Sequence, residues 1–140
     1  MKAGQRTAPE LTRNQALVLA ALNEADSPQS AYALLEQLRD AGIRAPLQVY
    51  RALDKLLELG RVHRLESLNA FVACQHPAGD AHGLTAFAIC NDCGQVEEFH
   101  DDSVGRRLTR WAGERAFSLH KAAIELRGQC ARCRANPQSR

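Results

Sequence analysis

The 140-residue sequence has no long hydrophobic run and no strong excess of one charge. No apolar stretch approaches the ~18 residues of a membrane-spanning helix, and the N-terminal residues lack the apolar stretch of a signal peptide. We therefore expect a cytoplasmic protein without a membrane partner, in a compartment where thiols stay reduced and can bind metals. The formal net charge is only +2, so bulk charge does not indicate nucleic-acid binding.

The sequence also lacks the zinc motifs that most directly indicate catalysis. Neither H-E-x-x-H nor H-x-E followed by P-C-x-x-C is present. A catalytic zinc needs an open coordination position and a nearby general base. We expect that the protein is not an enzyme and has no small-molecule substrate.

What the sequence does have is two C-x-x-C pairs among its five cysteines. Cys90 and Cys93 form the first pair, and Cys130 and Cys133 form the second. Each pair can aim two thiolates at one point, so two pairs supply the four sulfurs of a tetrahedral zinc site. The alternative, a thioredoxin-like redox dithiol, works alone and needs no second copy. Four thiolates leave no open position, so we expect a structural zinc.

Residues 1–74 carry the pattern of a winged helix-turn-helix domain. Caps, turns and helical spacing predict three helices followed by two strands that form a hairpin. The helices begin at Thr12 and span 31–41 and 46–59, and the strands span 61–65 and 70–74.

Residues 75–84 are rich in turn formers and predict a hinge linker. Beyond the linker, residues 85–140 predict a small α/β dimerisation domain that contains the structural zinc. Its strands are expected at 85–90, 95–100 and about 120–127, with a helix that begins after Asp101. The open strand edges of so small a unit favour pairing with a second copy, so we expect a homodimer and an overall α+β fold.

The third predicted helix has two distinct faces. Its buried stripe is expected to contain Val49, Leu53, Leu56 and Leu57. The residues that we expect to contact DNA, from the opposite face, are Gln48, Tyr50, Arg51 and Lys55. Gln and Arg can hydrogen-bond to base edges, while Lys and Tyr suit phosphates. A solvated helix face is the alternative, but a third helix before a hairpin is where winged helices place their reading element.

Residues 48–60 resemble the recognition helix of the ferric uptake regulator family, and the hairpin, linker and both cysteine pairs follow in the family's order. The runs 51–54 and 71–74 are most similar to the zinc uptake regulator branch. The resemblance covers about residues 11–133 and implies a zinc-responsive, dimeric repressor that binds double-stranded operator DNA at zinc uptake genes. Two departures stand out. Gln48 replaces a usual threonine, and Gln15 replaces an arginine for which Arg13 can substitute.

Residues around the linker predict a second metal site. Cys74 ends the second hairpin strand and His63 lies in the first, where cross-strand neighbours meet. The resemblance implies a regulatory zinc at His63, Cys74, His82 and Glu98. One thiolate, two imidazoles and a carboxylate make a plausible tetrahedral zinc set. With the structural site, this gives two Zn²⁺ per chain. We do not expect His76, Glu97 or His100 to be ligands.

Two other interpretations remain open at this point. The chain could be a family member that senses iron, manganese or peroxide, although the soft thiolate of Cys74 argues against oxygen-preferring metals. It could also be a winged-helix interaction module whose only zinc is structural, in which case Cys74 is a small buried hydrophobic residue.

Overall fold

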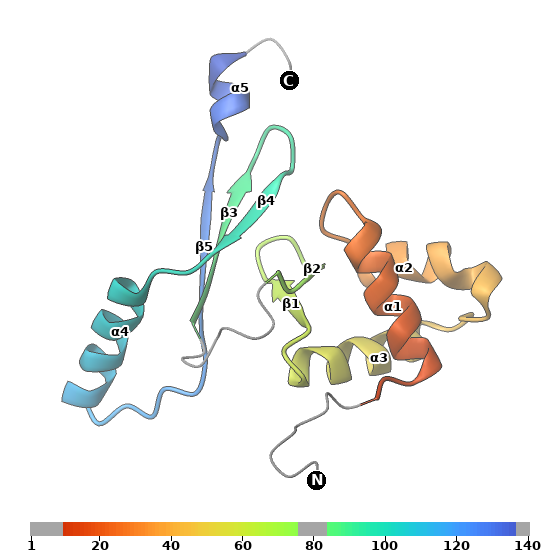
Figure 1. Ribbon diagram of the computed structural model, residues 1–140, viewed down its shortest axis with the longest axis horizontal. Helices are drawn as coiled ribbons and strands as arrows, with labels where there is room; N and C mark the ends of the chain where they lie inside the picture. The colour runs from red at the N-terminus through yellow and green to blue at the C-terminus, as the bar shows by residue number, and fades with distance from the viewer. Residues whose placement is uncertain (1–9, 76–83, 137–140) are drawn as a thin grey trace, which may run out of the picture.

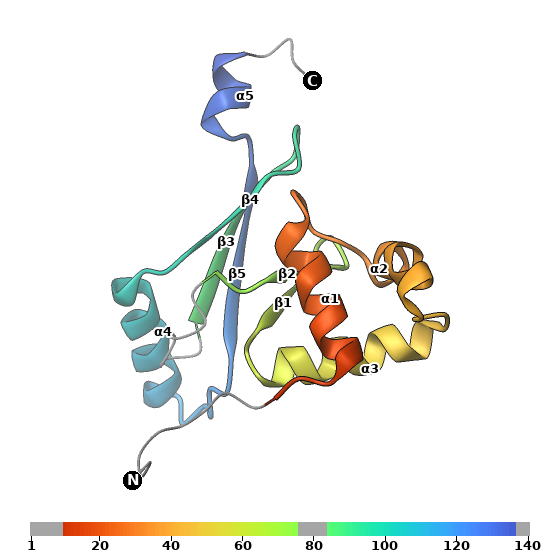
Figure 2. The ribbon, with the colours of Figure 1, turned by 45° about the vertical axis from the view of Figure 1, so that its right-hand side comes forward.

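The computed structural model describes residues 10–75 and 84–136. Figure 1 shows the three N-terminal helices on one side, a three-stranded sheet with the C-terminal helices on the other, and a β-hairpin between them. The rotated view of Figure 2 gives the same order, so the hairpin separates the helical part from the sheet. The predicted α+β class is confirmed.

Polar side chains start the helices of the N-terminal half. These elements are α1 (Arg13–Glu24), α2 (Ala31–Leu38), the 3₁₀ turn η1 (Arg39–Ala41) and α3 (Pro46–Glu58). Thr12 and Gln15 form a reciprocal capping box, in which each side-chain oxygen accepts a hydrogen bond from the other's backbone N–H. The Ser30 hydroxyl caps α2, and Pro46 begins α3 with a preset φ.

The turn after η1 explains where the second predicted helix ends. Gly42 has a φ of +106°, a left-handed conformation that other residues rarely adopt. The Arg13 guanidinium donates a hydrogen bond to the Ala41 carbonyl oxygen at 2.6 Å. Arg13 therefore ties the start of α1 to the end of η1, while Gln15 serves the α1 cap.

The three helices pack around one apolar core. The fully buried side chains include Val18, Leu34, Ile43, Leu53 and Leu56. Of the predicted stripe on α3, Val49, Leu53 and Leu56 are buried and Leu57 is partly buried against the same core. This packing fixes which face of α3 remains outside.

The hairpin, which we call the wing, consists of β1 (Val62–Leu65) and β2 (Ala70–Ala73) in antiparallel register. Backbone hydrogen bonds between Gln29 and Phe71 attach the wing to the segment before α2. The C-terminal sheet has the order β4-β3-β5, with β3 antiparallel to β4 and parallel to β5. Its strands are β3 (Leu84–Cys90), β4 (Val96–Phe99) and β5 (Ala122–Gly128).

Helix α4 (Asp102–Glu114) makes the crossover that a parallel strand pair needs, and Asp101 caps it as predicted. Figures 1 and 2 place α4 on the far side of the sheet from the N-terminal helices. Ala112 is the one buried residue of α4. A further short helix that the sequence did not predict, α5 (Ala131–Ala135), carries Cys133. No helix in the described ranges is long and apolar enough to cross a membrane.

Candidate zinc sites and DNA-facing helix

The four cysteines of the two C-x-x-C pairs come together at one end of the sheet, and we call them the four-cysteine cluster. Their sulfur atoms all lie within 4.8 Å of one another. The Sγ atoms of Cys90 and Cys133 are 3.8 Å apart, as are those of Cys93 and Cys130. Zn–S bonds of about 2.3 Å in a tetrahedron give a sulfur separation of about 3.8 Å, whereas a disulfide needs about 2.05 Å. The spacing fits zinc.

The electrostatics of this cluster also favour a bound cation. Backbone N–H groups of Cys93 and then of Cys130 donate to the Cys90 sulfur, and they lower the pKa of Cys90 to about 6. Burial, followed by the neighbouring thiols, raises the pKa of Cys133 to about 12. One thiolate is therefore ready as a ligand, and ionisation of the buried Cys133 thiol requires a positive partner close to it. A zinc ion supplies that charge.

A second group of potential ligands, His63, Cys74 and Glu98, lies between the wing and the sheet, and we call it the hinge cluster. One ligand atom from each lies within 4.8 Å of the others. The Glu98 Oε2 atom is 3.8 Å from both His63 Nε2 and Cys74 Sγ. Tetrahedral zinc would place such pairs about 3.4–3.6 Å apart, so the side chains are within a few tenths of an ångström of a ligating arrangement.

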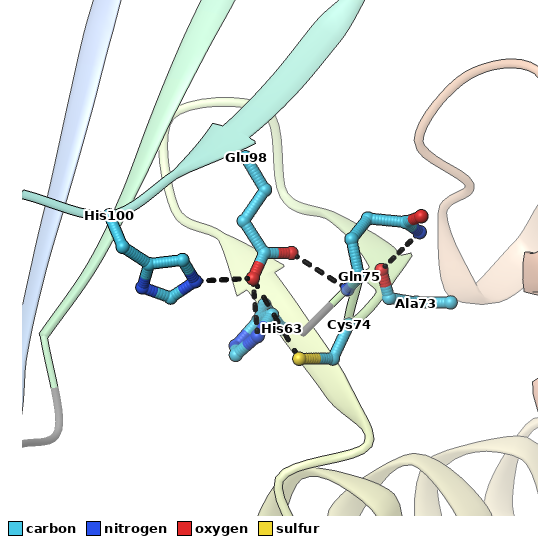
Figure 3. Close-up of polar contacts among 6 residues, drawn as sticks. All are labelled: His63, Ala73, Cys74, Gln75, Glu98 and His100. Carbon is cyan, nitrogen blue, oxygen red and sulfur yellow. Dashed lines mark hydrogen bonds and ion pairs between the residues drawn. The ribbon is translucent and has the colours of Figure 1, made fainter. Parts of the chain in front are cut away.

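The Glu98 carboxylate is the centre of the hinge cluster (Figure 3). Its side chain is only 3% exposed, and its Oε1 atom accepts a hydrogen bond from the Gln75 backbone N–H at 3.0 Å. A buried carboxylate needs compensating partners, and a divalent cation beside His63 and Cys74 is a strong one. The His63 ring also packs edge-on against Phe87 of β3, with centroids 5.5 Å apart. Donor chemistry and geometry both suit zinc.

Three further histidines lie near these ligands in the sequence, namely His76, His82 and His100. His82, the predicted fourth ligand, lies outside the described residues, as does His76. His100, which the sequence analysis set aside, lies beside Glu98 with its Nε2 atom 3.4 Å from Oε2 (Figure 3). The sequence did contain a signal for this proximity. His100 lies two residues after Glu98, and alternate residues of an extended chain share a face.

The predicted DNA-contacting residues of α3 differ in their exposure to solvent. Tyr50, Arg51 and Lys55 are exposed, with Lys55 3.5 Å from Glu58 in a surface ion pair. Gln48 is half-buried, and its side-chain oxygen accepts hydrogen bonds from the backbone N–H groups of Arg44 and Ala45. Gln48 therefore caps α3, which the sequence analysis did not foresee. Leu47, also not predicted, is 56% exposed on the same first turn.

A helix bundle with a wing, joined to a small sheet, with one potential metal site at the end of the sheet and another between wing and sheet, is the arrangement of a metal-binding winged-helix regulator. The model of the ferric uptake regulator family matches residues 9–127. The zinc uptake regulation protein of Escherichia coli K12 is 40% identical over 124 residues, covering 88% of this chain and 72% of that protein. The ferric uptake regulation protein of the same organism is 33% identical over 118 residues, covering 81% and 76%.

Two solved structures are also similar to this chain. Holo XcZur is 41% identical, with a TM-score of 0.84 over 92% of this chain and 89% of that chain. A zinc uptake regulator in complex with zinc and DNA is 38% identical, with a TM-score of 0.85 over 92% and 86%. The chain belongs to the ferric uptake regulator family and is a homologue of the zinc uptake regulators. Members of this family are transcription regulators, not enzymes, in accord with the sequence analysis.

Proposed function

We propose that this chain is a cytoplasmic, zinc-responsive repressor of zinc uptake genes that binds double-stranded operator DNA as a homodimer. The observation that carries the proposal is the hinge cluster. His63 and Cys74 come from or adjoin the wing, while Glu98 belongs to β4 of the sheet. A ligand set divided between two parts of the fold can convert metal binding into a domain arrangement.

The residues would work in the following way. His63, Cys74 and Glu98, with His82 from the linker, would hold the regulatory zinc, which supplies a cross-link between wing and sheet. The wing follows directly after α3, so holding the wing fixes α3 relative to the sheet. In a dimer this sets the separation of two α3 helices, which must match half-sites about one helical turn apart. The likeness to a zinc- and DNA-bound relative over 92% of the chain supports this arrangement.

An exposed apolar face supports the dimer. Val104, Leu108 and Trp111 recur at helical spacing on α4 and are 37%, 37% and 48% exposed. Phe117, which is 56% exposed, packs on Trp111 with ring centroids 6.0 Å apart. Such a face is suited to a second copy of the chain. Trp111→Asp should give a monomer in sedimentation, whereas the neighbouring Arg110→Asp should leave a dimer. A dimeric Trp111→Asp protein would exclude this face.

The function is tested by anisotropy of a labelled operator under buffered free zinc, for the parent and for Cys74→Ser. The parent should bind more tightly as zinc rises. Cys74→Ser should keep the four-cysteine zinc and lose most of the zinc response, because a serine hydroxyl is a much poorer zinc ligand than a thiolate. Coincident curves would remove Cys74 from the sensor and favour a module with structural zinc alone. A parent that responds to Fe²⁺ or Mn²⁺ but not to zinc would favour the other metal sensors.

A further inference from the structure

A transverse row of three residues in the sheet contacts the wing. Phe87 of β3 is in register with Glu98 of β4 on one side and with Glu125 of β5 on the other. Residues opposite one another in neighbouring strands share a face of the sheet, so this row points toward the wing. Glu98 belongs to the hinge cluster and Phe87 contacts the His63 ring. That leaves Glu125, which the proposed zinc switch does not use.

Glu125 accepts hydrogen bonds from the tip of the wing. Its Oε2 atom accepts a hydrogen bond from the Glu66 backbone N–H at 2.7 Å, and its Oε1 atom accepts one from the Ser67 backbone N–H at 3.1 Å. Both donors lie in the turn between β1 and β2. Although burial alone would raise the pKa of Glu125, hydrogen bonds from the Ser67 side chain and these backbone groups lower it. The carboxylate is therefore ionised at neutral pH and takes both donors at once.

The two ends of the wing are thus held separately. His63 and Cys74 bring the hinge cluster to the open end of the hairpin, and Glu125 holds the closed end. Between them, Leu65 and Val72 of the wing pack with Phe87, Ile89 and Val96 of the sheet. Attachment at two separated points restricts the rotation of the wing on the sheet more than one attachment point with apolar packing would.

We propose that Glu125 is a positioning residue that orients the wing on the sheet and so raises the affinity of the hinge cluster for zinc. The proposal rests on the proposed function of the hinge cluster. Without this contact a smaller fraction of molecules has the wing docked, and apparent zinc affinity falls in proportion to that fraction.

The test uses three variants of the full chain. Glu125→Gln is nearly isosteric, but its NH₂ group faces an N–H donor in place of a carboxylate oxygen. Glu66→Pro removes one donor from the wing, at the second position of a turn where proline is favoured. Glu66→Gln is the matched control, because it removes a charge from the same turn but keeps the backbone N–H. The readouts are amide hydrogen exchange at residues 66 and 67 and competitive titration of the exchangeable zinc.

Glu125→Gln should speed exchange of both amides and weaken the exchangeable zinc site by about tenfold, while zinc in the four-cysteine cluster and the dimer are unchanged. Glu66→Gln should behave as the parent. Glu66→Pro combined with Glu125→Gln should bind zinc no more weakly than Glu125→Gln alone, because both changes act on the same contact. The proposal is wrong if Glu125→Gln matches Glu66→Gln in both readouts. It is also wrong if the losses of zinc affinity in Glu66→Pro and Glu125→Gln multiply in the double variant. If the parent has no exchangeable zinc, the proposed function fails, and amide exchange still decides whether Glu125 holds the wing. If Glu66→Pro does not fold, the comparison of Glu125→Gln with Glu66→Gln decides alone.

Discussion

The two clusters use similar ligand chemistry but differ in where their residues come from. The four-cysteine cluster joins the turn after β3 to α5, entirely within the C-terminal part of the chain. The hinge cluster joins the wing to β4, across the boundary between the two parts. A site within one part can stabilise that part only, whereas a site across the boundary can also change how the parts are arranged. We therefore infer the structural and regulatory roles of the two clusters from their positions in the fold.

The largest expected effect comes from breaking the four-cysteine cluster. Cys90→Ser should lose the structural zinc together with C-terminal folding and the dimer, because metal binding at such sites is coupled to folding. Zinc content, circular dichroism and sedimentation measure the three losses. A folded, dimeric Cys90→Ser protein with unchanged zinc content would show that the cluster is not structural.

A smaller effect is expected from the hinge cluster. Glu98→Gln removes the carboxylate that faces both His63 and Cys74. Even the loss of a group that only supports a ligand weakens metal binding by ~10–100-fold, so a loss of at least this size is expected at the exchangeable zinc site. The fold and the dimer should persist, because the four-cysteine cluster is untouched. Glu97→Gln is the matched control, since Glu97 is the adjacent, exposed carboxylate on the same strand. Equal zinc affinity in the two variants would rule out Glu98 as a ligand.

Helix α3, the proposed DNA-reading helix, extends the comparison because its residues lie outside both clusters. Arg51→Ala should lower operator affinity by ~1–3 kcal/mol if Arg51 contacts a base edge. The loss should be the same factor with and without zinc, whereas a hinge variant should alter only the zinc-bound state. Operator titrations at a low and a high free zinc concentration measure the loss of operator affinity in each state. Parent-like operator binding by Arg51→Ala across a salt series would mean that α3 is not the reading helix.

The smallest effect concerns the start of α3. Gln48→Ala removes the side-chain oxygen that accepts from Arg44 and Ala45, and should destabilise the N-terminal domain by ~1 kcal/mol without changing zinc content. Gln48→Glu keeps an acceptor near the positive end of the helix and should retain most of that stability. Denaturant unfolding measures the difference. Equal stability of the alanine and glutamate variants would show that the cap contributes little.

Local signals in the sequence predicted most of the fold. Thr12, Ser30, Pro46 and Asp101 begin helices as predicted, because capping depends on neighbours within a single turn. The turn within each C-x-x-C pair is local in the same way, whereas the meeting of the two pairs was predicted from zinc's need for four ligands. The helix α5 was missed, since its five residues carry almost no periodic pattern.

Long-range contacts were less accessible from the sequence. The meeting of His63 and Cys74 with Glu98 was anticipated through the family resemblance, and the structure brings these three together. The contact of Glu125 with residues 66 and 67, 59 and 58 positions away, depends on how the wing docks and has no local signature. The DNA contact predicted for Gln48 stays a prediction, whereas its role in the α3 cap depends on the preceding turn, at Arg44 and Ala45, and was not foreseen.

We propose that one zinc holds the fold and that the other reports zinc availability. Native mass spectrometry of the intact dimer during graded chelation distinguishes these two roles. Each chain should first lose one zinc while the dimer persists, and the second zinc should leave only as the dimer dissociates. In Cys74→Ser the first step should be absent. Loss of both metals in a single step, or dissociation of the dimer at the first loss, would contradict the division into structural and regulatory sites.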